Sequence, residues 1–384
     1  MPTPAERPVV EPGPELTAEQ FARYSRQLML PGFGDTAQRR LGAARVLIIG
    51  AGGLGTAVAP VLAASGIGTL GLIDDDVVEL SNLHRQLAHG VADIGRPKVD
   101  SLADAIAAID PGCRVIRHPE RVTAATLPGI LDGYDLVVDG SDNFPTRYLA
   151  NDAAVLAGVP LVWGAILRFH GQVGVAWHGR GPTYRDLVPS PPPADEALSC
   201  ELGGVLPTLC TAIGSFLATE VIKLVTGIGE PLIGRVLTYD ALTARTREIP
   251  YAVSPETPAI TGLIDYDLFC GVPDDSDLTA LSAAALAGRL RAGERLTLLD
   301  VREPEEVAAR RIPGSVPLPL AELRAGAVPD AAGAPLVVVC ERDPRARTAA
   351  RMLAERGLAD VAYLAGGIQS YVAVGGEVEG DDIV

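Results

Sequence analysis

Short apolar runs recur along the first half of the chain, and segments with helical spacing separate them. The runs at 46–49, 69–73 and 136–138 have the length of strands, and 98–109 has the periodicity of an amphipathic helix. Alternating strands and helices predict an α/β fold with a doubly wound, mostly parallel sheet. Ligands of such sheets bind beyond the carboxyl ends of the strands.

A glycine-rich turn joins the first of these strands to the next helix. Gly50, Gly52 and Gly55 have the spacing G-x-G-x-x-G, and Gly53 lies among them. Such a turn lets backbone N–H groups and the start of a helix approach a phosphate closely. By itself the turn suits NAD, FAD or ATP equally, and a turn that binds no nucleotide is the alternative.

Acidic residues follow two of the predicted strands. Asp74 and Asp76 end the second strand, and Asp139 and Asp142 follow the run at 136–138. Because the carboxyl ends of parallel strands meet at one edge of a sheet, we expect the four carboxylates to face one pocket. An acidic side chain there binds a ribose hydroxyl or a metal ion. Alternatively, Asp142 caps the helix that follows it.

The loop after the second strand distinguishes classes of nucleotide enzyme. It contains Asn82, Arg85 and Gln86, and Lys98 starts the next helix. A dinucleotide oxidoreductase has no need of these groups, whereas a site that releases pyrophosphate from ATP needs cations. Lys98 is one of only two lysines in a chain that otherwise uses arginine, which hints at a chemical role.

Three motifs follow the glycine turn in order: Asp74-x-Asp76, Ser81-Asn82-Leu83-x-Arg85-Gln86 and Gly95-Arg96-Pro97-Lys98-Val99. Together they resemble the ubiquitin-activating-enzyme-like adenylyltransferases of the ThiF/MoeB type. This family includes enzymes that activate sulfur-carrier proteins for molybdopterin and thiamine synthesis. The resemblance implies a Rossmann-like domain that binds ATP and Mg²⁺.

The resemblance also implies roles for individual residues. Arg85 and Lys98 would be catalytic and would neutralise phosphate oxygens as charge develops toward pyrophosphate. Asp142, in Asp142-Asn143-x-x-x-Arg147, would carry the Mg²⁺ bound to ATP. The nucleotide would be held by the glycine turn, the acidic strand end and the polar loops: Gly50, Gly52, Gly53, Gly55, Asp74, Asp76, Asn82, Arg85, Gln86, Lys98, Asp142 and Asn143.

A helix is predicted at 17–30, with Thr17 as its N-cap. This helix carries Arg26 within the motif Arg-Tyr-x-Arg-Gln. By resemblance, Arg26 would contact the phosphates in the ATP site of a partner subunit, which implies a homodimer. Alternatively, Arg26 belongs to a solvated basic face of the helix.

A proline-rich stretch at 181–200 ends in Ser199-Cys200-Glu201. In the family, a loop at this place carries a cysteine that takes part in acyl or disulfide exchange with the C-terminus of the carrier. Cys200 is therefore a candidate catalytic residue, and a thiol near a helix start can have a lowered pKa. An inert loop thiol is the alternative.

The resemblance fails at one structural metal site. Many relatives hold zinc with two CxxC pairs, and the matching positions here are Thr183, Asp186, Asp267 and Cys270. One thiol does not supply the four soft or imidazole ligands that tetrahedral zinc requires. We therefore expect no structural zinc, and a loop that is either more mobile or held by packing.

The strand and helix pattern restarts after 278 and resembles a rhodanese domain, a small α/β sulfurtransferase. Cys340 ends a buried strand and opens a loop toward a helix from about Arg345. Backbone N–H groups and the helix dipole stabilise a thiolate there, and such a thiolate can carry a persulfide sulfur.

The loop after Cys340 departs from the usual rhodanese pattern. Pro344 removes one N–H donor, and Glu341 and Asp343 place negative charge beside the thiolate, which raises the pKa of the thiol. Sulfurtransferase activity is then reduced or uses a different donor. A domain that only docks partners is the alternative.

Composition limits the compartment and the partners. The net charge of −16 disfavours non-specific binding to nucleic acid and to anionic membranes. Five scattered cysteines and no recognisable secretory signal predict reduced thiols in a cytoplasm. We divide the chain into a disordered N-terminus (1–16), an adenylyltransferase domain (17–270), a linker (271–278) and a rhodanese-like domain (279–384).

This domain order predicts a two-step reaction. The C-terminal carboxylate of a ubiquitin-like sulfur carrier ending in Gly-Gly would attack the α-phosphate of ATP, which gives an acyl-adenylate. A persulfide on Cys340, loaded by thiosulfate or a cysteine desulfurase, would attack the acyl-adenylate, and Cys200 would resolve the acyl disulfide to a thiocarboxylate. Three alternatives stay open: adenylation of another carboxylate with a vestigial rhodanese domain, a non-catalytic scaffold for a carrier, and a nicotinamide oxidoreductase.

Overall fold

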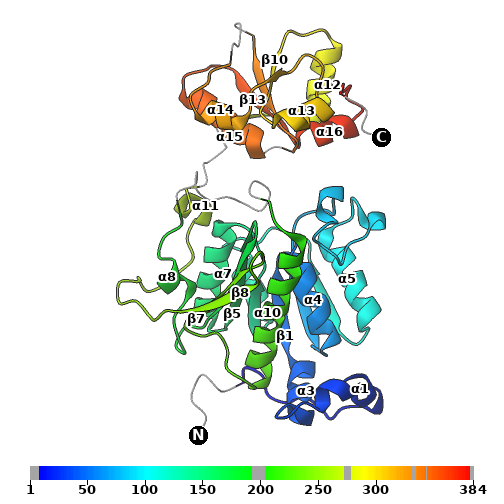
Figure 1. Cartoon of the computed structure of the whole chain (residues 1–384), viewed down its shortest axis with the longest axis vertical. Helices are drawn as coiled ribbons and strands as arrows, with labels where there is room; N and C mark the ends of the chain where they lie inside the picture. Colours follow the sequence, from blue (N-terminus) through cyan, green and yellow to red (C-terminus); the bar gives the residue numbers. More distant parts are fainter. Residues whose placement is uncertain (1–7, 193–203, 272–277, 330–333, 343, 381–384) are drawn as a thin grey trace. The chain divides into compact units, whose positions relative to one another are not determined.

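Two units make up the chain, Met1–Val272 and Pro273–Val384, and each has its own sheet (Figure 1). The computed structural model describes residues 8–192, 204–271, 278–329, 334–342 and 344–380. In each unit, buried apolar residues form two clusters, one on each face of the sheet.

The described residues of the first unit form an eight-stranded sheet in the order β3-β2-β1-β4-β5-β6-β7-β8. The strands from β3 to β5 are parallel, and β6 to β8 extend the sheet with antiparallel pairs. The chain order reverses beside β1, so the ends of β1 and β4 flank the crevice where such sheets bind ligands. The strands are β1 (Arg45–Ile49), β2 (Thr69–Ile73), β3 (Arg114–His118), β4 (Leu136–Asp139), β5 (Leu161–Leu167), β6 (His170–Ala176), β7 (Arg235–Asp240) and β8 (Arg245–Pro250).

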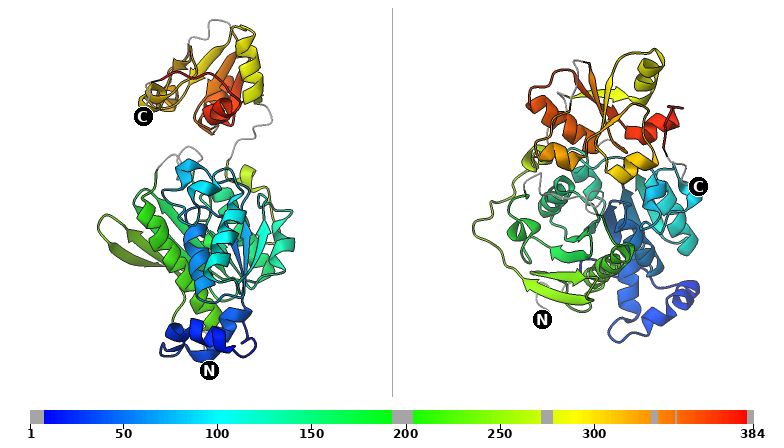
Figure 2. Two further views of the ribbon diagram at one scale, coloured as in Figure 1. Left: turned by 90° about the vertical axis from the view of Figure 1, so that its right-hand side faces the viewer. Right: turned by 45° about the horizontal axis from the view of Figure 1, so that its top comes forward.

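Helices cover both faces of this sheet (Figures 1 and 2). Side chains alternate along β1, so Val46 and Ile48 pack on one face while Leu47 and Ile49 pack on the other. The first face is covered by α3 (Gly34–Ala43), α4 (Gly55–Ala64), α5 (Lys98–Ile109) and α10 (Pro207–Thr226). The second face is covered by α6 (Leu127–Leu131) and α7 (Phe144–Ala157), with the short helices α8 (Tyr184–Leu187) and α11 (Tyr266–Phe269) beside α7. The doubly wound, mostly parallel fold is thus confirmed.

Helix α10 is the core helix of the first face. By length and composition alone its 20 residues could cross a membrane, with a mean hydropathy of 1.5. Within the unit, however, 56% of that apolar stretch is buried, and the helix packs on α4, β5 and β6. Its hydrophobicity is therefore accounted for by the core of the unit.

The segment at 8–16 packs against the first unit, so the expectation of disorder over 1–16 is wrong for these residues. The Val9 N–H donates to the Leu224 carbonyl at 3.0 Å, and Gly13 and Arg39 exchange two hydrogen bonds. Val10 is buried in the core. The pair of valines anchors a stretch whose Pro and Glu content alone suggested disorder.

The predicted N-terminal helix is divided in two. Thr17 caps α1 (Ala18–Arg23) through a capping box with Gln20, and Tyr24 separates α1 from α2 (Ser25–Leu28). The Tyr24 hydroxyl donates to Asp110 at the end of α5, and Gln27 donates to the Ser65 carbonyl at the end of α4. The two helices therefore lie at the edge where the parallel strands begin (Figure 1).

The described residues of the second unit form a five-stranded parallel sheet in the order β11-β10-β12-β13-β9. Helices pack on both of its faces, as predicted for a small α/β domain. The strands are β9 (Thr279–Ser282), β10 (Thr297–Asp300), β11 (Val316–Pro317), β12 (Leu336–Val339) and β13 (Val361–Ala365). The helices are α12 (Ala283–Arg291), α13 (Pro304–Ala309), α14 (Leu320–Arg324), α15 (Pro344–Glu355) and α16 (Gly367–Ala373).

Candidate functional site

The glycine turn closes tightly between β1 and α4. Gly50 has a φ of +92°, which favours glycine, and a Cβ at Gly55 would lie only 1.8 Å from the Gly50 carbonyl oxygen. A Cβ at Gly50 would lie 3.1 Å from the carbonyl oxygen of Gly140, in the turn after β4. The turns after β1 and β4 therefore touch, as the crevice at the switch point requires.

Asp74 ties the acidic end of β2 to the glycine turn. Its carboxylate accepts the N–H of Ala51 at 2.7 Å and the N–H of Asp76 at 2.9 Å. Burial raises the pKa of Asp74, against the opposing effects of Lys98 and the two N–H donors. This carboxylate positions the backbone of the turn, in addition to any contact with a ligand.

Lys98 lies beside this acidic group. Its Nζ donates to Asp76 Oδ2 at 2.6 Å, and its backbone N–H donates to the Asp76 carbonyl at 2.9 Å. The Lys98 side chain is 8% exposed, whereas that of Asp76 is 67% exposed. The amine is thus held at the edge of the crevice by a carboxylate that water or a ligand can reach.

The polar loop after β2 contains three predicted residues, one of which, Gln86, lies at the glycine turn. Asn82 is buried and accepts the Glu79 N–H, which shapes the loop. Arg85 is half-buried and donates to the Ser81 carbonyl at 2.8 Å. Gln86 is buried, and its amide nitrogen lies 3.7 Å from where a Cβ at Gly52 would be. Its Oε1 is buried without a partner among the described residues, as expected of a group that awaits a ligand.

Asp139 differs from the other three acidic residues, and the expectation that it faces the pocket is wrong. Asp139 is fully buried and binds Arg147 and Ser141, so its carboxylate has no room for a ligand.

Asn143 is the N-cap of α7, and its Oδ1 accepts the Thr146 N–H. The alternative role of Asp142 as that cap is therefore wrong.

Asp142 is exposed and makes no hydrogen bond or ion pair with the residues that the structure describes. Mg²⁺ in ATP sites takes one or two carboxylates together with phosphate oxygens and water. Gly140 contacts the glycine turn, and Asp142 follows it by two residues. Its free carboxylate fits that requirement. The ligand oxygens of Asp74, Asp75 and Asp76 also lie within 4.8 Å of one another, but Asp74 and Asp76 already have hydrogen-bond partners.

Two residues at the turn were not predicted. His89 Nε2 lies 3.1 Å from the Ala51 carbonyl oxygen. A carbonyl oxygen can only accept a hydrogen bond, so Nε2 carries the proton. In this tautomer Nδ1 accepts a hydrogen bond from the Ser101 hydroxyl. Burial lowers the pKa of His89, which favours this neutral form. The Cys210 Sγ fills the space beside Gly53, and burial raises the pKa of this thiol to about 11. Neither residue belongs to a motif in the sequence, because each reaches the turn through the tertiary fold.

Arg26 lies outside the crevice of its own chain. It is exposed in α2, at the edge where the strands begin, and makes no hydrogen bond with the described residues. The glycine turn lies at the opposite, carboxyl edge of the sheet. Arg26 can therefore act at an ATP site only in another copy of the chain.

In the second unit, Cys340 follows β12 and is buried to 1% exposure. Its Sγ accepts the Ala346 N–H at 3.3 Å. Burial raises the pKa of Cys340, and the N–H groups of Ala346, Arg342 and Arg345 and the charge of Arg345 oppose that effect. The loop therefore supplies N–H donors to the sulfur in spite of Pro344.

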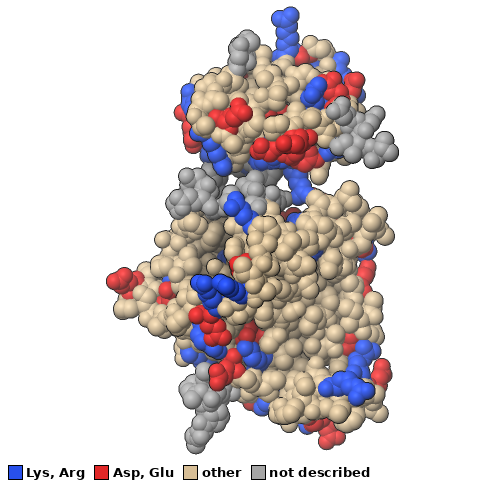
Figure 3. Space-filling model, in the orientation of Figure 1, with Lys and Arg blue, Asp and Glu red and all other residues tan. Residues whose placement is uncertain are grey.

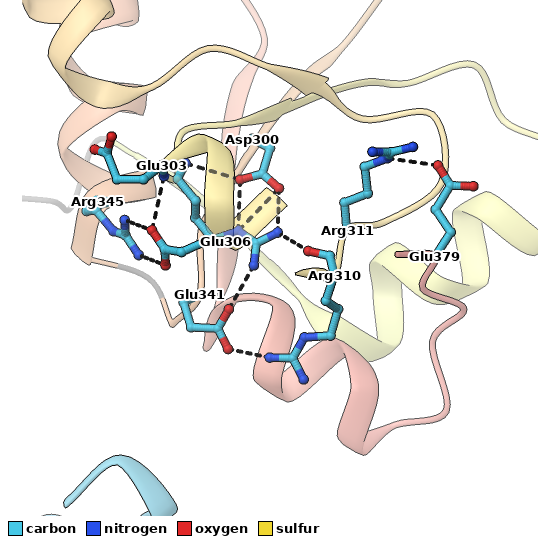
Figure 4. A network of polar contacts seen from close by, with 9 residues as sticks. Asp300, Glu303, Glu306, Arg310, Arg311, Glu341, Arg345 and Glu379 are labelled. Atoms are coloured by element: carbon cyan, nitrogen blue, oxygen red, sulfur yellow. Dashed lines mark hydrogen bonds and ion pairs between the residues drawn. The ribbon is translucent and has the colours of Figure 1, made fainter. Parts of the chain in front are cut away.

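The charged residues around this loop are paired with one another (Figure 4). Glu341 accepts from Arg302 at 2.9 Å and also binds Arg310, while Arg345 forms two bonds of 2.6 Å to Glu306. The two arginines offset the charge of Glu341. The raised pKa of Cys340 was predicted correctly, but its main cause is burial and not Glu341. Asp343 lies outside the described residues.

Two family models match the chain. The ThiF family model matches residues 24–259, and the rhodanese-like domain model matches residues 282–374. The chain belongs to the ThiF family. It is an adenylyltransferase that uses ATP, with a rhodanese-like sulfurtransferase domain. The nicotinamide oxidoreductase and the non-catalytic scaffold are thereby set aside.

Relatives with similar domain content support this assignment. The probable adenylyltransferase/sulfurtransferase MoeZ of Mycobacterium tuberculosis is 45% identical over 377 residues, which cover 95% of this chain and 96% of that protein. The adenylyltransferase and sulfurtransferase MOCS3 of Bos taurus is 42% identical over 328 residues, which cover 81% of this chain and 72% of that protein. The sulfur carrier protein adenylyltransferase of Thermus thermophilus is 46% identical over 267 residues, which cover 67% of this chain and 98% of that protein.

Solved structures share the fold of the ThiF-family domain. A crystal structure of PaaA has a TM-score of 0.54 and 25% identity over 62% of this chain and 76% of that chain. The crystal structure of E. coli MccB with MccA-N7isoASN matches this chain with a TM-score of 0.56 and 22% identity, over 62% of this chain and 74% of that chain.

The ThiF-family domain carries a polar network around Thr183 and Asp186, two of the four positions that the family resemblance matches to a zinc site. Asp186 accepts the N–H and hydroxyl of Thr183 and the N–H of Ser254. Beside them, Arg185 of α8 forms two bonds of 2.7 and 2.8 Å to Asp152 of α7. Asp152 also accepts the hydroxyl of Tyr266 at 2.8 Å, which brings α11 into the network. Cys270 is buried in the adjacent core, so the described residues 183–188 of the predicted loop are held by packing and hydrogen bonds. Cys200 lies outside the described residues.

Replacing Asp152 with Asn should destabilise the ThiF-family domain, while metal chelation should not. The side chains of Arg185 and Asp152 are 12% and 3% exposed, and removing one partner of a buried pair costs about 3–5 kcal/mol. Calorimetry of the full chain, with and without EDTA, measures both effects. The control Asp35→Asn breaks the exposed pair with Arg39 and should cost less than about 1 kcal/mol. A fall in Tm on adding EDTA would contradict the expectation of no structural zinc.

Proposed function

We propose that the ThiF-family domain joins AMP to the C-terminal carboxylate of a ubiquitin-like sulfur carrier, and that the rhodanese-like domain then delivers sulfur to it. Support for the carrier comes from the Thermus thermophilus relative, which is named a sulfur carrier protein adenylyltransferase, and support for sulfur delivery comes from the rhodanese-like domain. In the first step a carboxylate oxygen attacks the α-phosphorus of ATP and pyrophosphate leaves. The observation that carries the proposal is that three groups lie beside one glycine turn: the Asp74–Asp76 strand end with its bound Lys98, the Gln86 amide, and the Gly140 turn that precedes Asp142.

The charge of each residue in the crevice indicates its role in this step. Lys98 and Arg85 would neutralise the oxygens of the phosphates as pyrophosphate separates. Asp142 would hold Mg²⁺, which supplies positive charge to the phosphates when it is bound. Gln86, with its unpartnered buried oxygen, would donate and accept hydrogen bonds at the nucleotide.

In the second step a persulfide on Cys340 would attack the acyl carbon, with AMP as the leaving group and an acyl disulfide as product. A second thiol, Cys200 in this proposal, would attack the Cys340 sulfur of that disulfide, which releases the thiocarboxylate and leaves a Cys200–Cys340 disulfide for a cellular thiol to reduce. The persulfide would be loaded by thiosulfate or by a cysteine desulfurase.

We propose further that the enzyme is a homodimer in which Arg26 completes the site of the partner copy. The short N-terminal helices and the loop after β2 both expose large apolar side chains, namely Phe21, Met29 and Leu30, and Leu80, Leu87 and Val91. Uncharged side chains also cover the face over α4 and α10 (Figure 3). These surfaces favour burial against a second copy.

Mixing Arg26→Ala and Lys98→Met dimers should restore adenylation if Arg26 acts in the partner site. Each variant alone should have strongly reduced activity, whereas a mixed dimer pairs an intact Lys98 site with an intact Arg26 of the neighbour. Carrier-dependent ATP–pyrophosphate exchange, measured after subunit exchange, reports the recovery. An absence of recovery with proven exchange of subunits would contradict the shared site.

Mass spectrometry of a candidate carrier tests the complete function. The full chain is incubated with carrier, ATP, Mg²⁺ and thiosulfate or a cysteine desulfurase with cysteine. The expected product carries one sulfur in place of one oxygen at its C-terminus. A different result would favour adenylation of another carboxylate: the enzyme would form AMP with a peptide that lacks the carrier fold and would form no AMP with any carrier.

A further inference from the structure

Ser141 is held by a single buried ion pair. Asp139 Oδ1 accepts both the Ser141 N–H at 2.9 Å and the Ser141 hydroxyl at 2.5 Å. From the other side, Arg147 Nη2 donates to the Ser141 carbonyl at 3.0 Å. The backbone N–H, the backbone carbonyl and the side chain of one residue are therefore all fixed by the same two charged groups.

The pair itself has almost no freedom. Asp139 is fully buried, Arg147 is 6% exposed, and Arg147 Nε donates to Asp139 Oδ2 at 3.2 Å. Arg147 Nη2 also donates to the Gly164 carbonyl of β5 at 2.7 Å, and its guanidinium lies 5.9 Å from the centre of the Tyr184 ring. The guanidinium is thus locked between β4, β5 and α8, and neither charge is available to a ligand.

The turn is also fixed on the side of the nucleotide loop. The Gly140 N–H donates to the Ile49 carbonyl at 2.9 Å, and a Cβ at Gly50 would lie 3.4 Å from the Ser141 nitrogen. The next residue along the chain is Asp142, whose exposed carboxylate has no partner among the described residues. Asp142, with its exposed carboxylate, therefore directly follows a backbone segment that is fixed against the glycine turn.

We propose that Asp139 and Arg147 are positioning residues that hold the Asp142 carboxylate in place for the metal ion of the ATP complex. The inference rests on the proposed role of Asp142 as the metal ligand. Partners that fix a ligand's backbone lower the cost of ordering it when the metal binds, and their loss typically weakens metal binding. The buried pair therefore sets the metal affinity of the site without touching the metal.

Asp139→Asn is the principal test, with Ser141→Ala as a milder variant. Both are made in the full chain, and Mn²⁺ binding is measured by electron paramagnetic resonance in the presence of a non-hydrolysable ATP analogue. Asp139→Asn removes the counter-charge of Arg147 and should raise the Kd for Mn²⁺ by about 10- to 100-fold. Ser141→Ala removes one hydrogen bond and should raise it by about 2- to 10-fold. This second variant retains the ion pair, so it keeps the test valid if Asp139→Asn fails to fold.

Asp152→Asn is the matched control. It breaks a second buried arginine–aspartate pair that involves α7. Asp152 binds Arg185 and Tyr266 and forms no hydrogen bond with Ser141. Its Tm should fall while its Kd for Mn²⁺ stays that of the wild type. If Asp139→Asn and Ser141→Ala bind Mn²⁺ as tightly as the wild type does, the positioning role is wrong although the site is intact. If the wild type itself binds no Mn²⁺ with the analogue, the proposed ATP–metal site fails as well.

Discussion

Replacing Lys98 with Met should lower carrier-dependent ATP–pyrophosphate exchange by about 100- to 1,000-fold, the typical loss when one preorganised group that stabilises developing charge is removed. The amine is 8% exposed and lies 2.6 Å from Asp76 at the edge of the glycine turn. A methionine keeps the buried part of the side chain packed. Asp76 is 67% exposed and is left to water, so the Tm should change little.

Lys223→Met is the control for this prediction. Lys223 is the other lysine of the chain, and it also forms an ion pair, with Glu220 near the end of α10. Its loss should affect stability but not exchange, because α10 ends at the edge of the sheet that is opposite the crevice. Equal losses of exchange in the two variants, or full exchange in Lys98→Met, would contradict the role assigned to Lys98.

Replacing Cys340 with Ala should abolish formation of the thiocarboxylate and leave ATP–pyrophosphate exchange unchanged. The two reactions separate because Cys340 belongs to the rhodanese-like domain, whereas the glycine turn belongs to the ThiF-family domain. Without this sulfur the loop before α15 has no atom to carry a persulfide. Carrier mass and pyrophosphate exchange are measured on the same protein preparation.

Cys270→Ala is the control for Cys340→Ala. Both thiols are buried, but Cys270 packs in the core beside α7 and α11 and has no role in the proposed reaction. Its product should carry sulfur as the wild type does. Thiocarboxylate produced by Cys340→Ala at the wild-type rate would show that another donor attacks the acyl-adenylate directly.

The fold could be predicted because the conformation of the backbone and its burial restrict which residues can occupy many positions. Gly50 needs a positive φ, and β1 and β2 need uninterrupted apolar residues between two layers of helices. The β7–β8 hairpin was not predicted, since every residue of β8 is exposed and no apolar alternation marks it. The packing of 8–16 was missed because two valines were outweighed by the proline and glutamate around them.

The candidate site could be predicted only in part, because position along a strand does not give the direction of a side chain. Asp139 ends β4 as expected, yet it points to an arginine eight residues later on α7. The partners of Glu341 come from positions about 30 and 40 residues earlier, so its charge could be read from the sequence but the offsetting charges could not. Such pairings arise only when the chain is folded.

The scarcity of lysine has a further consequence for an enzyme that would make an acyl-adenylate. Such a mixed anhydride acylates free amines, and a lysine-rich surface would be modified by the enzyme's own product. This chain has only two lysine amines, and carboxylates hold both of them in ion pairs: Lys98 with Asp76, and Lys223 with Glu220. The arginines that provide the remaining basic side chains stay protonated and are poor nucleophiles. The chain would therefore offer few nucleophilic amines to an acyl-adenylate formed at its own site.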